Sequence, residues 1–164
     1  MIRMAVAHLG LDRTSNTPVV VLREDGGERT LPIWIGAPEA AAIALELRGE
    51  KPARPMTHDL LKAMLVGLGG ELRRVTIAGL RENTYLAKLL VYRGEAIFEL
   101  DARPSDSIAL ALRTNTPIFA NEELLDRSAA ETEEPGDEAT RNQAEALKKF
   151  LARLNPEDLG RFQP

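Results

Sequence analysis

Hydrophobic and polar residues first alternate along the chain with the period of a strand, and then with that of a helix. Short runs rich in β-branched and other apolar residues predict strands at 4–11, 18–24 and 28–35. The sequence DGG between the second and third runs is a turn signal, so these two runs are expected to form a hairpin. The stretch 39–48 is apolar nearly all round and predicts a buried helix.

The segment 49–56 contains two prolines and cannot be helical throughout. Helical spacing returns at 58–69, with Thr57 as the expected N-cap. The larger apolar residues of this helix share one face: Leu60, Leu61, Met64, Leu65 and Leu68. The pattern therefore predicts an amphipathic helix that ends at the two glycines after it.

The second half of the chain repeats this order. Strands are expected at 71–80, 84–92 and 95–102, followed by an apolar helix at 105–113 with Ser105 as its N-cap. The run 117–126 closes the unit. A shift of 65 residues places Ile33–Arg48 on Phe98–Arg113 with six identities, although most of these are alanine, isoleucine or leucine and chance is the alternative. We expect an α+β fold in which duplicated β-β-β-α units pack into one compact domain.

The C-terminal part has a different composition. Residues 127–142 contain no apolar residue larger than alanine, and this predicts a disordered acidic linker between a domain at 1–126 and a tail at 143–164. The tail predicts a short amphipathic helix with Leu147, Phe150, Leu151 and Leu154 on one stripe. This helix either docks on the body or binds a protein partner.

Composition and charge narrow the class of protein. The 164 residues include no cysteine, which excludes disulfides and thiolate metal sites, and 44% of them are hydrophobic, enough for a sizeable core. With neither a signal peptide nor a membrane-spanning run, we expect a cytoplasmic protein. The net charge is −4 and neither part of the chain is strongly basic, so a polyanionic partner would have to meet a local basic patch or metal ions.

Two charged clusters stand beside expected helix starts. The first, ARPMTHD, contains Arg54, His58 and Asp59, and the second, DARPSD, contains Asp101, Arg103 and Asp106. In both, proline after arginine holds the backbone extended, so that the arginine side chain projects from a rigid joint and can grip a phosphate or carboxylate.

These residue types suggest phosphodiester chemistry. Asp101 and Asp106 could share Mg²⁺ or Mn²⁺, which would activate water and hold a scissile phosphate. His58 could act as a general base or donate to a phosphate. The structural alternatives are an ion pair of Arg103 with either aspartate, and acidic side chains that merely complement a helix dipole.

Other polar or aromatic residues are interpreted as structural. His8 lies in an expected strand, Glu39 complements a helix dipole, and Trp34 is expected in the core. The sequence has no phosphate-binding glycine loop, no zinc-protease motif and no serine-hydrolase motif. Nothing in these motifs therefore assigns an enzyme class.

Three separated blocks carry a resemblance: LPIWIGAPEAAAIALEL, RPMTHDLL and LDARPSDSIALALR with a following PIF. In this order they resemble the bifunctional nuclease domain family, also known as domain of unknown function 151, over about residues 3–126. The resemblance implies an α+β fold, a wedge-shaped homodimer with a large groove, and activity on both DNA and RNA. The matching motif positions are His58, Asp59, Asp101, Arg103 and Asp106.

Our first hypothesis is a metal-assisted nuclease that acts on DNA or RNA. Asp101 and Asp106 would hold the metal ion, while Arg54 and Arg103 would hold the phosphate. His58, oriented by Asp59, would activate water or protonate the leaving oxygen. The alternative is a non-enzymatic regulatory module that binds a protein through its C-terminal helix, and a small-molecule-binding domain is a third hypothesis.

Overall fold

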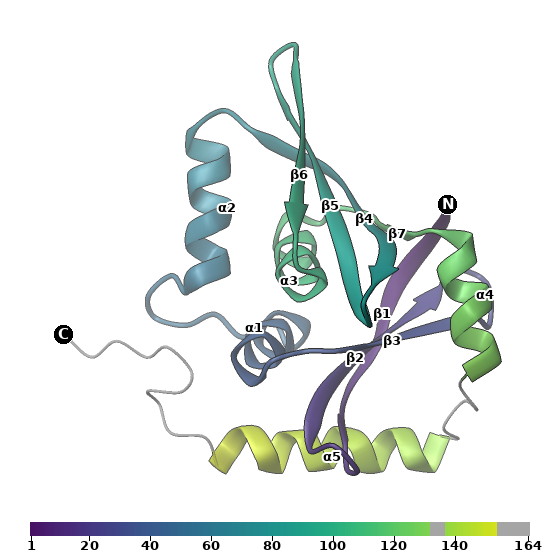
Figure 1. Ribbon diagram of the computed structural model, residues 1–164. Coiled ribbons are helices and arrows are strands. Elements are labelled where there is room, and N and C mark those ends of the chain that lie inside the picture. Colours follow the sequence, from purple (N-terminus) through teal and green to yellow (C-terminus); the bar gives the residue numbers. More distant parts are fainter. Residues whose placement is uncertain (132–136, 154–164) are drawn as a thin grey trace.

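The computed structural model describes residues 1–131 and 137–153, and this part of the chain forms one mixed sheet with helices packed around it (Figure 1). The seven strands of the sheet lie in the order β3-β2-β1-β7-β4-β5-β6. Their bounds are β1 Ile2–Asp12, β2 Thr17–Glu24, β3 Thr30–Trp34, β4 Glu71–Arg81, β5 Thr84–Arg93, β6 Ala96–Ala102 and β7 Ile118–Ala120.

Each half of the sheet is an antiparallel meander followed by a helix. Strands β1, β2 and β3 pair in turn and lead into α1 (Ala37–Leu47), and strands β4, β5 and β6 pair in turn and lead into α3 (Pro104–Thr114). Strand β7 joins the halves, because it pairs antiparallel to β1 and parallel to β4. The α+β class is confirmed and the elements follow the expected order. Duplication as the origin of this order stays a prediction.

Helices α1 and α3 pack against the sheet and against each other, and α2 (Thr57–Gly67) packs on the outer side of α3. The alanine-rich and leucine-rich faces of α1 and α3 bury most of their length, as expected from their all-round apolar character. The largest fully buried side chains of the core include Leu22, Leu31, Ile43, Ile77, Ile108 and Leu125. Within the described residues, no helix has the length and apolar character needed to cross a bilayer.

The two expected N-caps are both wrong by a residue or more. Thr57 is the first residue of α2, and the backbone N–H of Met56 before it donates to Oδ2 of Asp59 over 2.9 Å. Ser105 lies inside α3, which starts at Pro104. Proline suits the first helical turn because it has no N–H to leave unsatisfied there.

Trp34 is not in the core. It lies at the end of β3 with 52% of its surface exposed, and its Nε1 donates to Oδ2 of Asp12 over 3.1 Å. An indole at a strand end can cover apolar surface with its ring while its N–H finds a surface acceptor. His8 lies in β1, the strand expected for it.

Helices replace most of the predicted acidic linker. Residues 127–131 complete α4 (Glu122–Glu131) and residues 137–142 begin α5 (Asp137–Arg153), so the predicted disorder is wrong for these residues. Alanine, glutamate and arginine are good helix formers, and their propensity outweighs the lack of large apolar side chains. The remaining linker residues, 132–136, lie outside the described residues.

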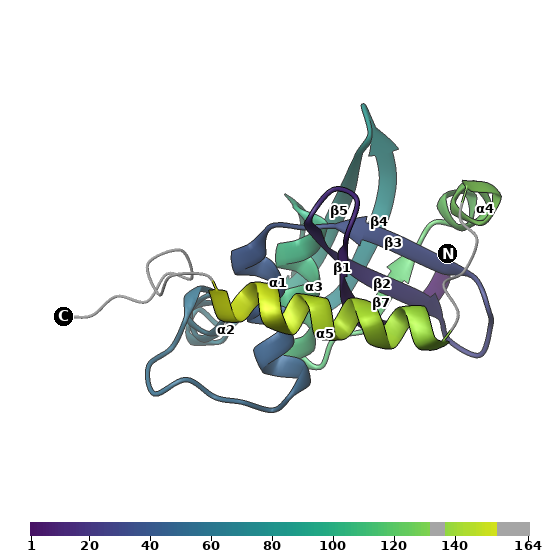
Figure 2. The same ribbon diagram turned by 90° about the horizontal axis from the view of Figure 1, so that it is seen from below.

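Helix α5 packs across β1 (Figure 2). Leu147 is 4% exposed and belongs to the core, and Ala146, Phe150 and Leu151 pack against the core around it. Gly10 of β1 permits this approach, since a Cβ atom at that position would lie 2.8 Å from Cβ of Gln143. Docking on the body, one of the two alternatives for this helix, is therefore confirmed. Leu154 and the rest of the expected tail lie outside the described residues.

Candidate functional site

Helix α2 meets the body through the polar residues of its first turn. The buried residue of α2 is His58, which is 6% exposed, and its side chain faces the first turn of α3. Histidine is intermediate in its tendency to be buried, so a histidine as the buried contact of an otherwise leucine-rich helix is unusual. The contact surface is polar because it is made by charged groups of α3.

A continuous row of four polar side chains links α1, α2 and the start of α3. Nε2 of His58 lies 3.0 Å from Oδ1 of Asp106, and the other carboxylate oxygen of Asp106 accepts a hydrogen bond of 2.6 Å from Nε of Arg103. A terminal nitrogen of Arg103 donates to Oε1 of Glu39 over 2.9 Å. We call Glu39, His58, Arg103 and Asp106 the polar cluster.

The electrostatics of the polar cluster fix its protonation pattern. Burial alone would raise the pKa of the Asp106 carboxyl, but hydrogen bonds from Arg103 and His58 and the charge of Arg103 outweigh it, and the pKa is lowered. The same hydrogen bond and that to Glu39 raise the pKa of Arg103. Asp106 is thus an anion at neutral pH and can only accept hydrogen bonds. Neutral His58 must carry its proton on Nε2, which leaves Nδ1 as the proton acceptor.

A second polar contact joins the same three helices, through Asp59, the residue after His58 in α2, and Arg113 at the other end of α3. The side chain of Arg113, in the last turn of α3, is 3% exposed. Its Nε donates to Oδ1 of Asp59 over 2.6 Å, and its terminal nitrogens donate to the carbonyl oxygens of Ala109 and Ala42 over 3.0 and 3.1 Å. Arg113 thus fastens α2 and α1 to α3.

Asp59 therefore anchors a helix instead of orienting His58. One of its oxygens accepts from Arg113 and the other from the Met56 backbone N–H, so neither is bonded to the ring of His58. Burial raises the pKa of the Asp59 carboxyl, but these hydrogen bonds and the charge of Arg113 outweigh burial and lower it. The residue that holds the His58 ring is Asp106.

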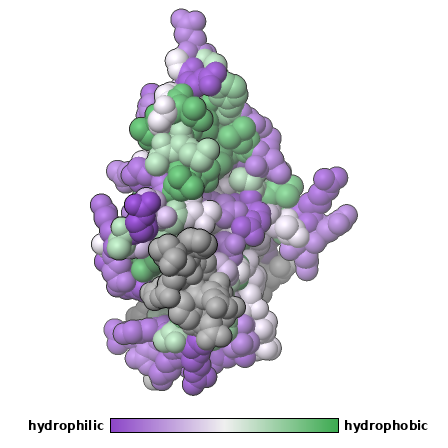
Figure 3. Space-filling model, turned by 90° about the vertical axis from the view of Figure 1, so that its left-hand side faces the viewer, coloured by the Kyte–Doolittle hydropathy of each residue, from purple (hydrophilic) through white to green (hydrophobic). Residues whose placement is uncertain are grey.

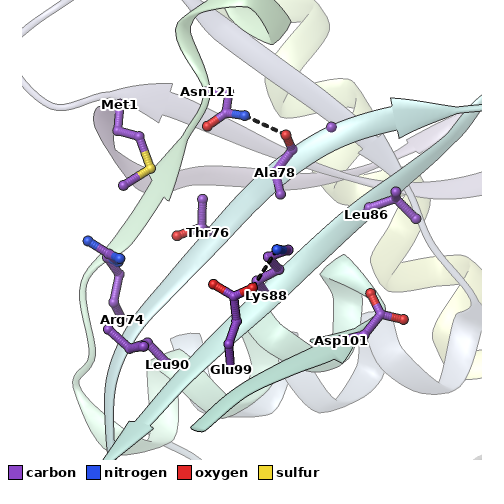
Figure 4. A pocket seen from close by; sticks show the side chains of 11 residues that line it. Met1, Arg74, Thr76, Ala78, Leu86, Lys88, Leu90, Glu99, Asp101 and Asn121 are labelled. Atoms are coloured by element: carbon purple, nitrogen blue, oxygen red, sulfur yellow. Dashed lines mark hydrogen bonds and ion pairs between the residues drawn. The ribbon is translucent and has the colours of Figure 1, made fainter. Parts of the chain in front are cut away.

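The structure does not bring Asp101 to Asp106. Asp101 pairs across the sheet with Lys88 and lines a hollow on the face turned away from α3 (Figure 4). Its neighbours along β6 pair with Ala87 and Leu89, whose side chains are buried. Because successive residues of a strand point to opposite faces, the two carboxylates lie on different sides of the sheet.

The two aspartates that were expected to share a metal ion are therefore separated by the sheet. Asp106 is further occupied on both oxygens by Arg103 and His58. In the described residues, no group of three or more histidine, aspartate or glutamate side chains is arranged to hold a metal ion.

Arg54 is exposed and lies in the loop between α1 and α2, shortly before His58 in the sequence. Arg103 is also exposed, with 65% of its side chain accessible, although it is held on two sides. A guanidinium has five N–H donors, and the hydrogen bonds to Asp106 and Glu39 use two of them. Arg103 is thus a fixed, accessible cation with donors to spare.

The sequence argument missed Arg113 and gave Glu39 a smaller role than it has. The signal for Arg113 is an arginine at the end of a helix that is apolar all round, since such a position is buried and needs acceptors. Glu39 carries no comparable signal, because its partner Arg103 lies 64 residues away in the sequence.

Comparisons with known proteins give the family. Residues 20–133 match the family model of the bifunctional nuclease domain. The chain is 42% identical to an uncharacterized protein of Mycobacterium tuberculosis over 158 residues, which are 93% of this chain and 94% of that protein. It is also 32% identical over 123 residues to bifunctional nuclease 2 of Oryza sativa subsp. japonica, covering 72% of this chain and 38% of that protein.

A similar match, 32% identity over 111 residues, is found with bifunctional nuclease 1 of Arabidopsis thaliana. It covers 65% of this chain and 34% of the plant protein, so the chain spans about a third of these plant relatives. The matched region contains α1, α2 and α3 and thus the whole polar cluster. The chain belongs to the bifunctional nuclease domain family.

Proposed function

We propose that this chain is a nuclease that hydrolyses phosphodiester bonds in DNA and RNA, with His58 as its acid–base group. The observation that carries the proposal is the hydrogen-bonded row from His58 through Asp106 and Arg103 to Glu39. A carboxylate that fixes a histidine tautomer, beside an accessible arginine, is an arrangement suited to proton transfer at a bound phosphate. Relatives named bifunctional nucleases support the substrate class.

In the proposed reaction, Arg103 holds the scissile phosphate with its free N–H groups. Nδ1 of His58 takes a proton from water as the water oxygen bonds to phosphorus. The bond from phosphorus to the leaving sugar oxygen breaks, and that oxygen is protonated from solvent or by the imidazolium. Asp106 stabilises the charged ring while it holds the proton.

Local charge, not net charge, would bring the polyanion to this site. The chain carries a net −4, which opposes nucleic acid over long distances. The loop before α2, which leads along the chain to His58, nevertheless carries the exposed cations Lys51 and Arg54. With Arg103 these residues supply the phosphate contacts that nucleic-acid affinity requires.

The proposed steps do not use the expected Mg²⁺ or Mn²⁺. The two aspartates that were to share the ion lie on opposite faces of the sheet, and both oxygens of Asp106 already have partners. If His58 is the acid–base group, we expect cleavage to be insensitive to chelators.

The test uses the two histidines of the chain as a matched pair. We expect purified protein to cleave single-stranded and double-stranded DNA and RNA, and we expect His58→Gln to lower the rate at least about a hundredfold. His8→Gln, a change of the same chemistry in β1, should leave the rate unchanged. Thermal melts of both variants separate a loss of chemistry from a loss of folding.

Arg103→Lys tests the role of the Arg103 guanidinium. The change keeps the positive charge but removes the planar guanidinium, whose N–H groups bond to Asp106 and Glu39 and, as proposed, to the phosphate. We expect the rate to fall about tenfold or more with little change in melting temperature. Unchanged cleavage by a folded His58→Gln protein would show that the acid–base role is wrong. Absence of cleavage by the unaltered protein on every substrate would favour the non-enzymatic alternative.

We also propose that the chain forms a homodimer through a surface that we call the apolar face. This face combines the outer side of α2 with β6, and Figure 3 shows its hydrophobic side chains gathered on one side of the molecule. Its exposed residues are Leu60, Leu61, Met64, Leu68, Phe98 and Leu100. Leu68 is 68% exposed, and a contiguous exposed apolar surface commonly marks a protein interface.

A second copy of the chain is the partner that fits this face. β6 is the last strand of the sheet, so its outer edge has unpaired backbone groups that a second β6 could pair antiparallel about a two-fold axis. The same axis would bring the two α2 helices and their leucines together. The face lies next to the polar cluster, since both include α2.

Light scattering with size-exclusion chromatography tests the dimer. We expect the unaltered chain to elute with twice the mass of one chain, and Met64→Lys to elute as a monomer. Leu86→Asp is the control, because Leu86 is also exposed but lines the hollow on the opposite sheet face. A monomeric unaltered chain, or a dimer that survives Met64→Lys and Leu68→Lys together, would contradict the proposal.

A further inference from the structure

The face of the sheet turned away from α3 has an open hollow of about 510 Å³ that the proposed nuclease steps leave unused (Figure 4). We call it the open-face pocket. It lies mainly over β4, β5 and β6, and its lining includes Arg74, Thr76, Leu86, Lys88, Leu90 and Asp101, with Glu99 and Asn121. Its volume is typical of sites for small molecules and cofactors.

The strand register arranges the lining in two rows. Arg74 pairs with Leu90, which pairs with Glu99 on β6. Thr76 pairs with Lys88, which pairs with Asp101. Each row spans two strand spacings, roughly 10 Å in all, so Arg74 and Asp101 stand at opposite corners of the pocket. A ligand that reaches both must be elongated.

The side chain of Arg74 has a hydrogen-bond donor without an acceptor. Its Nε is buried and has no hydrogen-bond partner among the described residues. A buried, unpaired donor costs free energy, and in native proteins such groups call for a specific explanation. Beside it, buried Thr76 offers a hydroxyl. An oxyanion at this corner would accept from both.

The opposite corner has the complementary character. The side chain of Asp101 is exposed and has no hydrogen bond or ion pair with the described residues, so its carboxylate is available to hydroxyl or amino donors. Lys88, between the corners, is neutralised by an ion pair with Glu99. Leu86 and Leu90 provide apolar surface along the way. The pocket thus has hydrogen-bond donors at one corner and a free carboxylate at the other, with an ion pair and two leucines between them.

We propose that the open-face pocket binds a nucleoside monophosphate. The phosphate would accept from Arg74 and Thr76, the sugar and base would lie over Leu90 and Leu86, and hydroxyl or amino groups of the nucleoside would donate to Asp101. An amino acid is too short, because its carboxylate and ammonium groups are neighbours while the corners lie two strand spacings apart. Free phosphate would fill only the corner of Arg74 and Thr76 and would not reach Asp101.

This site is separate from the proposed nuclease site and does not depend on cleavage. The two lie on opposite faces of the sheet, as Asp101 and Asp106 show. Binding and cleavage can therefore be tested independently in the full chain.

The experiment titrates the full chain with adenosine 5′-monophosphate, adenosine and inorganic phosphate, with calorimetry for affinity and NMR amide shifts for location. We expect the nucleotide to bind at least about tenfold more tightly than either fragment, with shifts at β4, β5 and β6. Arg74→Gln and Asp101→Asn should each weaken nucleotide binding about tenfold or more. Arg73→Gln, a neighbouring arginine outside the lining, should not.

Each outcome decides the proposal. It is overturned if the nucleotide does not bind, if phosphate alone binds as tightly, or if both variants bind as the unaltered chain does. It is also overturned if the shifts fall on α2 and α3. Should Arg74→Gln fail to fold, Asp101→Asn at an exposed strand position gives the same decision. The nuclease proposal can be contradicted independently of this one. His58→Gln should abolish cleavage and keep nucleotide binding, whereas Asp101→Asn should weaken nucleotide binding and keep cleavage.

Discussion

Helices α2 and α3 have the same length, eleven residues, and opposite relations to the core. α3 buries eight residues, among them Ile108 and Leu110, whereas α2 buries His58 alone. Both contain several large apolar residues, and both carry charged residues in their first turn. Apolar content therefore does not decide which helix is buried; the contacts made by the polar residues do.

Polar contacts to α3 hold α2 in place. His58 bonds to Asp106, Asp59 bonds to Arg113, and Nζ of Lys62 donates to the carbonyl oxygen of Arg113 over 2.6 Å. These three bonds lie along the side of α2 that faces α3. Leu60 and Leu61, on its other side, are consequently left exposed.

This difference answers whether the charged groups at the helix starts are fasteners or a site. In one pair, Asp59 with Arg113, the arginine is buried, and the pair acts as a fastener. The other, His58 with Asp106, continues to the exposed Arg103 and meets solvent. The same three helices thus carry a closed contact and an open one, which begin at consecutive residues of α2.

The largest expected effect comes from the closed contact. Arg113→Met leaves the Asp59 carboxylate and two carbonyl oxygens without their donor, and we expect the free energy of unfolding to fall by about 3–5 kcal/mol. Urea denaturation measures this. Arg13→Met, at an exposed arginine in a turn, should change it by less than about 0.5 kcal/mol. Equal, small effects of the two changes would show that α2 is held by something else.

The next largest effect should come from truncating apolar residues, which should lower the free energy of unfolding in α3 much more than in α2. Ile108→Ala in α3 creates a core cavity and should cost about 2–5 kcal/mol of unfolding free energy. Leu60→Ala on exposed α2 should cost the folded monomer less than about 0.5 kcal/mol. Denaturation at several protein concentrations distinguishes monomer stability from dimer stability, because only the latter depends on concentration. A concentration-independent loss of several kcal/mol for Leu60→Ala would contradict the comparison.

Acid should weaken the closed contact. The folded-state pKa of Asp59 is lowered, so between that value and its unfolded value of about 3.9 the unfolded chain binds more protons and stability rises with pH. The contribution of Asp59 is fully present above about pH 4–5 and is lost as the pH falls through the folded value. Asp59→Asn should lower the unfolding free energy at pH 7 by about 1.5–3 kcal/mol and flatten its decline in acid. Parallel declines for the two proteins would show that Asp59 has no such role.

The order of strands and helices could be predicted from the sequence because it depends on local period. Runs such as 71–80 and 84–92 were placed within a residue or two of β4 and β5. The same local evidence led to the wrong expectation for Trp34, whose exposure depends on Asp12 at the end of another strand. The linker expectation was wrong for a related reason: composition suggested disorder where helix propensity prevails.

The candidate site was predictable in part. The motifs identified His58, Arg103 and Asp106, because charged residues beside apolar helices are unusual wherever they occur. Which of them meet depends on the face of each strand end, and no spacing showed that Asp101 points away from Asp106. Arg113 was missed because its acceptors come from three helices.

Removal of metal ions should have the smallest effect, and it tests the open contact. The proposed steps use Nδ1 of His58 and the donors of Arg103, and the described residues hold no metal-binding group of side chains. Cleavage in excess EDTA should therefore equal cleavage without it, while His58→Gln should remain inactive in either buffer. If EDTA abolishes cleavage and Mn²⁺ restores it, His58 and Asp106 do not act as we propose. The row they form with Arg103 and Glu39 would then be a fastener like the Asp59–Arg113 pair, and the catalytic ligands would have to come from elsewhere in the assembly or from the nucleic acid itself.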